Sequence, residues 1–124
     1  MYELTKQFRF DAAHTLDRDI ETESSRRIHG HSYRAEVALR GRPDPETGMI
    51  MDVGVLDREL ESVRDALDHR FLDEINDLGP ATLENLSRWI WVRLKPGMPA
   101  LAKVSVFRDS NNDSCTYWGE GEFA

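Results

Sequence analysis

The sequence predicts an α+β fold, in which a four-stranded antiparallel sheet carries two helices on one face. Segments of alternating apolar and polar residues lie near both ends of the chain, which is typical of half-buried strands. Two segments with helical periodicity lie between them. The expected order is therefore strand, strand, helix, helix, strand, strand. With 124 residues, the chain has the length of one domain, which we expect to span 1–124.

The first two predicted strands cover residues 2–10 and 31–40. Both alternate, and only Lys6 interrupts the apolar face of the first. If the first strand continues, His14 has the parity of its apolar face, and His31 lies on the apolar face of the second. Two adjacent antiparallel strands would bring these imidazoles near one another.

Residues 15–27 separate these strands and are polar, so we expect an irregular surface loop. Loops of this length are often functional. Two alternatives remain open for Arg26 and Arg27 in this loop. They would either recognise a phosphate or carboxylate on a ligand, or form an ordinary solvated charge pair.

The central segment predicts two amphipathic helices. Asp52 is a plausible N-cap for the first, which ends near Asp68 and His69. The second begins near Thr82 and stops at the sequence Lys-Pro-Gly of residues 95–97. Its stripe of buried residues includes two tryptophans that we assign to the core or to a subunit contact. These are Trp89 and Trp91.

The last two predicted strands cover residues 101–108 and 114–119, and the polar residues 111–113 between them are a turn signal. Four strands in an open sheet leave two edges, which invites closure through neighbouring subunits.

Composition excludes several classes of function. The net charge of −7 argues against a nucleic-acid-binding surface, which needs clustered Lys and Arg. The single cysteine, Cys115, allows no intramolecular disulfide and fits a reducing compartment. No segment approaches the length of a membrane span or resembles a signal peptide, so we expect a cytoplasmic protein without membrane contact.

The sequence His29-Gly30-His31 is the clearest chemical motif. On a strand its two imidazoles point to the same side and can hold a metal together. A third imidazole, from His14, would complete the three-histidine arrangement of an open catalytic zinc site. The alternative is that all three are ordinary strand or loop histidines. Asp68-His69 has two interpretations as well: an oriented acid–base pair, or a histidine favoured by the helix C-terminus.

Several motifs in this order and at this spacing resemble those of the 6-pyruvoyl-tetrahydropterin synthase and 6-carboxytetrahydropterin synthase family, which has the tunnelling fold. The matching stretches cover nearly the whole chain. They are residues 10–14 (FDAAH), 28–33 (IHGHSY), 48–52 (GMIMD), 67–72 (LDHRFL), 82–86 (TLENL) and 117–120 (YWGE).

This resemblance implies a zinc-dependent lyase. Zn²⁺ would be held by His14, His29 and His31, and would act as a Lewis acid on the hydroxyls of a dihydropterin side chain. Asp68 and His69 would belong to the proton-transfer machinery.

The resemblance also implies how the substrate and the subunits are arranged. Thr82 and the carboxylate of Asp109 would hold the amidine edge of a pterin, as in 7,8-dihydroneopterin triphosphate or a relative. Family members form homohexamers of two stacked trimers, in which each trimer closes a barrel. The motifs do not distinguish pterin, folate or queuosine-type deazapurine pathways.

The chain departs from the family pattern at the catalytic base. The family has a cysteine at the position of Ser25 in carboxy-type members, or of Glu23 in animal-type members, and this loop has no cysteine. A serine hydroxyl is a much weaker base than a thiolate, and Cys115 lies on the last predicted strand. Asp109 stands where the family has glutamate. The alternative function is therefore a hexamer that binds a pterin-like or purine-like ligand without catalysis or with a divergent reaction.

Overall fold

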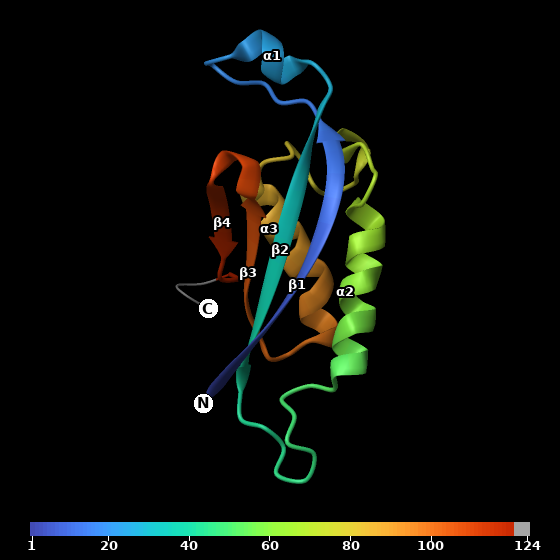
Figure 1. Ribbon diagram of the computed structural model, residues 1–124, viewed down its shortest axis with the longest axis vertical. Helices are drawn as coiled ribbons and strands as arrows, with labels where there is room; N and C mark the ends of the chain where they lie inside the picture. Colours follow the sequence, from blue (N-terminus) through green and yellow to red (C-terminus); the bar gives the residue numbers. More distant parts are fainter. Residues whose placement is uncertain (121–124) are drawn as a thin grey trace.

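The computed structural model describes residues 1–120; the last four residues of the expected domain, 121–124, lie outside the described part. The elements run in the expected order, with one addition. They are β1 (Tyr2–His14), α1 (Thr22–Arg26), β2 (His29–Gly41), α2 (Val53–Leu67), α3 (Leu83–Leu94), β3 (Leu101–Arg108) and β4 (Asp113–Tyr117) (Figure 1). Short 3₁₀ turns occupy Leu72–Glu74, Lys95–Gly97 and Asp109–Asn111.

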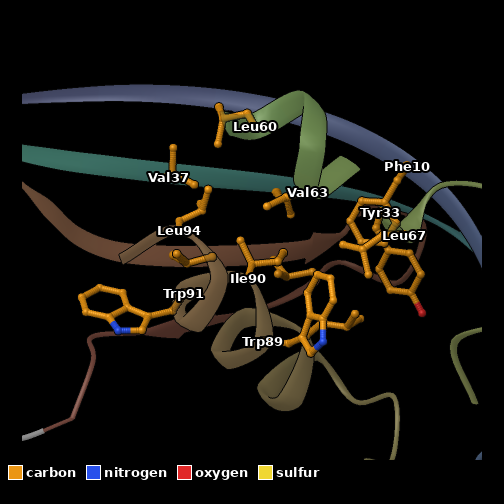
Figure 2. Packing of buried hydrophobic residues seen from close by; sticks show 14 of the residues in the cluster. Phe10, Tyr33, Val37, Leu60, Val63, Leu67, Trp89, Ile90, Trp91 and Leu94 are labelled. Carbon is orange, nitrogen blue, oxygen red and sulfur yellow. The ribbon is translucent and has the colours of Figure 1, made fainter. Parts of the chain in front are cut away.

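The four strands form one antiparallel sheet in the order β1-β2-β3-β4, which confirms the predicted fold class. Helices α2 and α3 cover one face of this sheet (Figure 1). The core lies between the two layers, where Figure 2 shows Phe10 and Tyr33 of the sheet beside Leu67 of α2. Both tryptophans of α3 are buried, so the core interpretation holds for them (Figure 2).

Helix α2 begins after Asp52, the N-cap that the sequence predicts, and α3 begins after Thr82, near its predicted start. The Asp52 carboxylate accepts a hydrogen bond from the Gly54 N–H at 2.8 Å. Thr82 Oγ1 accepts one from the Asn85 N–H at 3.1 Å. Each cap satisfies a backbone donor that the first helical turn leaves free. None of the helices within residues 1–120 is long and apolar enough to cross a membrane.

The hairpin of β1 and β2 is longer than the alternation predicts, and this length positions the histidines. β1 continues to His14, which pairs directly with His29, while Ala12 pairs with His31 and Phe10 with Tyr33. Because side chains alternate along a strand, all three histidines share the face that α2 and α3 cover. They lie at the end of the core, beside the long loop.

The prediction of an irregular loop over 15–27 is wrong in part, because the loop contains the short helix α1. Glu21 has a left-handed backbone conformation (φ 56°) that turns the chain into α1. The Ser25 N–H donates to the Glu21 carbonyl at 3.0 Å, and the Leu16 N–H donates to the Ser25 carbonyl at 2.7 Å. These bonds hold α1 beyond the ends of β1 and β2 (Figure 1), with Ser25 buried.

Candidate metal centre

Three imidazoles converge at the end of the β1–β2 hairpin. His14, His29 and His31 each offer a ligand nitrogen, and these atoms all lie within 4.8 Å of one another. The ring centroids are 4.5–5.0 Å apart. His14 is buried and the other two are partly exposed. Three protein ligands with one open side are the arrangement of catalytic zinc sites.

Backbone carbonyls orient two of these rings. His14 Nδ1 lies 3.0 Å from the Ala81 carbonyl oxygen, and His29 Nδ1 lies 2.8 Å from that of Arg27. A carbonyl only accepts, so each Nδ1 carries the proton and each Nε2 keeps a free lone pair. His14 Nε2 is buried and has no hydrogen-bond partner among the described residues. A buried nitrogen of this kind requires an explanation, and metal ligation provides one.

The environment favours the neutral form of His14 and His31, which is the form that binds a metal. Burial lowers the pKa of His14, and the neighbouring His29 lowers it further. Burial also lowers the pKa of His31 to about 4, with Arg108 as the next contributor. The residues present therefore fit a divalent metal of the kind that imidazole ligands favour, such as zinc.

A cavity of about 300 Å³ opens onto the three histidines. Ser25 lines it and is buried, so the position where the family has cysteine does face the histidines. Glu23 lies elsewhere. Its side chain is 87% exposed, pairs with Arg27 at 2.8 Å and lines a separate hollow over α1. The carboxylate residue that lines the histidine cavity is Glu21.

A second cavity of about 260 Å³ adjoins the first and shares His14 with it. Thr82 lines this cavity, as expected for a ligand-binding residue at the start of α3. So does Tyr33, whose buried hydroxyl has no partner within residues 1–120. Burial raises the pKa of Tyr33 to about 12, so the hydroxyl keeps its proton as a potential donor.

Asp109 lies outside both cavities. Its carboxylate accepts two hydrogen bonds from Arg34, at 3.1 and 3.0 Å, and lies 3.6 Å from Arg9. The hydrogen bond from Arg34 is the main cause of its lowered pKa. Arg9 and Arg34 alternate with buried Phe10 and Tyr33, so this cluster lies on the sheet face opposite the helices.

Asp68 and His69 contact one another, and neither lines the 300 Å³ histidine cavity. The Asp68 carboxylate accepts from the Asp11 N–H at 2.9 Å and lies 3.0 Å from His69 Nδ1. The Asp11 bond is the main cause of the lowered pKa of Asp68. The His69 side chain is 80% exposed and lines an open hollow of about 580 Å³ that His31 and Ser32 also line.

Arg26 and Arg27 of the loop form ion pairs on the surface. Arg26 bonds Asp17 at 2.7 Å and Arg27 bonds Glu23 at 2.8 Å, with both arginine side chains mostly exposed. Neither lines the histidine cavity.

Sequence reasoning missed both arginines that line the histidine cavity, Arg18 and Arg108, of which Arg108 contacts a histidine. Arg108 lines both cavities, and its Nη1 lies 3.4 Å from His31 Nε2. Asp113 of β4 pairs with it at 2.7 Å. The available signal was parity, since Arg108 continues the alternation of Val104 and Val106 on the apolar face of β3.

Comparisons with known proteins show the family to which the chain belongs. The family described as 6-pyruvoyl tetrahydropterin synthase matches residues 3–120. The 6-carboxy-5,6,7,8-tetrahydropterin synthase of Synechocystis is 35% identical over 122 residues, covering 94% of this chain and 89% of that protein. The human 6-pyruvoyl tetrahydrobiopterin synthase is 36% identical over 90 residues, covering 68% of this chain and 62% of the human protein.

Solved structures show the same fold. The 6-pyruvoyl tetrahydropterin synthase of Caenorhabditis elegans superposes with a TM-score of 0.83 at 30% identity, covering 96% of both chains. The Plasmodium vivax enzyme superposes with a TM-score of 0.73 at 20% identity, covering 94% of this chain and 96% of the other. By sequence and by its tunnelling fold, the chain belongs to the 6-pyruvoyl tetrahydropterin synthase family.

Proposed function

We propose that this protein is a zinc-dependent lyase of the 6-pyruvoyl or 6-carboxytetrahydropterin synthase type. Its substrate would be a dihydropterin, such as 7,8-dihydroneopterin triphosphate or a relative. The observation that carries the proposal is the convergence of three imidazoles, with His14 Nε2 buried and free of any described partner. When bound, zinc would supply Lewis-acid activation of the hydroxyls on the pterin side chain.

In this proposal the residues of the chain divide the work. His14, His29 and His31 hold the metal, and the carbonyl bonds to the Nδ1 atoms of His14 and His29 present their Nε2 lone pairs to it. Thr82 contacts the ligand from the adjoining cavity. Asp109 would bind the amidine edge of the pterin. To do so, its carboxylate has to give up its hydrogen bonds from Arg34.

Ser25 and Glu23 are the two proposed replacements for the family's cysteine base. Position favours Ser25, which is buried in the histidine cavity. Acid–base chemistry favours Glu23, because a carboxylate accepts a proton more readily than a serine hydroxyl. A solved variant of the Plasmodium vivax synthase is described as the mutant of a catalytic glutamate, which supports a carboxylate in this role. Glu23 would have to leave Arg27 to reach the cavity.

The Asp68–His69 pair is the second proposed proton-transfer group. The carboxylate holds His69 Nδ1 at 3.0 Å, so Nε2 is the nitrogen that remains available to a substrate. Since His69 does not line the histidine cavity of its own chain, the pair fits a site completed by a neighbouring subunit. The homohexamer of two stacked trimers that the family resemblance implies would provide that neighbour.

Turnover tests the proposal. The zinc-loaded protein is incubated with 7,8-dihydroneopterin triphosphate, and the products are identified by mass spectrometry. We expect a carboxy- or pyruvoyl-tetrahydropterin product that His29→Ala abolishes, and a large increase in rate for Ser25→Cys. His29→Ala should also lose stoichiometric metal by elemental analysis.

Two results would contradict the proposed lyase activity. If zinc-loaded Ser25→Cys forms no product although the pterin binds, the alternative of a non-catalytic ligand-binding protein replaces it. Full metal content in His29→Ala would refute the metal site itself.

A further inference from the structure

Two arginines, Arg18 and Arg108, line the cavities at the candidate metal ligands, and Arg108 contacts one of these ligands directly. Arg108 Nη1 approaches His31 Nε2 at 3.4 Å, and the arginine side chain is only 22% exposed. The same side chain lines both cavities that His14 lines. A guanidinium stays charged at any pH at which the protein is folded, so this charge is permanent.

Asp113 fixes where that charge lies. Its carboxylate accepts from Arg108 Nε at 3.2 Å and from Nη2 at 2.7 Å, across the β3–β4 register. A bidentate pair of this kind holds the guanidinium plane in one orientation. Nη1 is then the nitrogen left to face His31, and the carboxylate partly offsets the charge that the site experiences.

A metal cation and Arg108 therefore compete at the same place. If His31 binds the metal through Nε2, the lone pair of this atom can be directed at Arg108 or at the metal, but not at both. In addition, a cation at the three histidines lies close to a partly buried guanidinium, where the repulsion between like charges is screened less than in water.

We propose that Arg108 weakens metal binding at the three histidines and that Asp113 moderates this effect. The inference rests on the proposed metal site and adds to it a charged pair that sets the affinity. Substitution of residues beside metal ligands commonly changes the metal affinity on the order of 10- to 100-fold. Arg108 acts here as a positioning residue, through His31 and through its charge.

The two substitutions Arg108→Met and Asp113→Asn should change the Zn²⁺ affinity in opposite directions, which distinguishes this role from a structural one. Arg108→Met removes the charge and should tighten Zn²⁺ binding by about 10-fold or more. Asp113→Asn keeps Arg108 charged but removes the offsetting carboxylate, and should weaken binding several-fold. If the pair only ties β3 to β4, both substitutions would leave the affinity unchanged or weaken it.

Arg34→Met is the matched control. Arg34 is also a partly buried arginine held by two hydrogen bonds to an aspartate, with a side chain 19% exposed, but it lies on the opposite face of the sheet. Its loss removes a comparable ion pair without changing the charge beside the histidines, so the zinc affinity should not change.

The experiment measures Zn²⁺ dissociation constants of the metal-free full-length protein by competition with a chromophoric chelator. Co²⁺ absorption spectra report whether the coordination is retained, and circular dichroism verifies folding. Arg108→Gln is the second neutral variant if Arg108→Met does not fold. Tighter binding in a neutral Arg108 variant, with weaker binding in Asp113→Asn, supports the proposal.

Equal or weaker binding in the neutral Arg108 variants, with normal binding by the parent protein, overturns this inference and leaves the metal site intact. If neither the parent nor the Arg108 variants bind zinc, the metal site is refuted and the inference falls with it. Binding by an Arg108 variant alone would be its strongest support.

Discussion

Acid should destabilise the metal-free protein through His31. Its pKa lies near 4 in the folded chain against an ordinary value of 6.5, because burial and then Arg108 disfavour the imidazolium. In the unfolded chain, His31 therefore binds a proton below about pH 6.5, whereas in the folded chain it binds this proton only below about pH 4. Stability is fully present above pH 6.5 and falls as the pH decreases through this window.

The size of the loss follows from the pKa difference. The difference between a pKa of about 4 in the folded chain and 6.5 in the unfolded chain corresponds to an upper value of about 3 kcal/mol. His31 is partly exposed, so solvent screening reduces the expected loss to about 1–3 kcal/mol. His14, whose pKa is also lowered, adds to the loss in the same direction.

Urea denaturation of the chelator-treated protein at several pH values between 7 and 4 measures this effect, with His31→Gln as the comparison. The carboxylates titrate in both proteins, so the difference between their pH slopes isolates His31. We expect the variant to lose about 1–3 kcal/mol less between these limits. Identical pH slopes would refute the conclusion that His31 is held neutral.

Three further substitutions test individual contacts. Thr82→Ala removes the N-cap bond to Asn85 and should cost about 1 kcal/mol of stability in denaturation, which Thr82→Ser restores; no loss would contradict the cap. Tyr33→Phe removes a buried hydroxyl without a described partner, so stability should change by less than about 1 kcal/mol, and a loss above about 2 kcal/mol would reveal a missed hydrogen bond. Asp109→Asn should weaken binding of a pterin analogue, and an unchanged dissociation constant would remove Asp109 from the site.

The sequence predicted most of the fold because each element has a local signal. Alternation marked the strands, and helical periodicity marked α2, with Asp52 as its cap, and α3, which begins near Thr82. The parity of His14 and His31 also predicted that they share one face, which the register confirms. These signals depend only on the two side-chain periods of strands and helices.

The remaining features depend on contacts between distant segments. α1 has five residues and is held by the bond from Leu16 to the Ser25 carbonyl, which no periodicity reveals. Arg108 reaches His31 only because β3 pairs with β2. The pairing of Asp109, in the turn directly after β3, with Arg34 of β2 depends on the same register. Short motifs identify residues whose side chains can take part in binding or catalysis, while the sheet register determines which of them lie close together.

Metal-dependent binding of the pterin tests the central claim most directly. Isothermal titration calorimetry compares 7,8-dihydroneopterin binding to the zinc-loaded protein, to the chelator-treated protein and to His29→Ala. The account predicts binding that is strong with zinc and at least about 10-fold weaker in both other samples. Equal affinity in all three, or no binding to the zinc-loaded protein, would contradict the assignment of His14, His29 and His31 as a metal site that serves a dihydropterin.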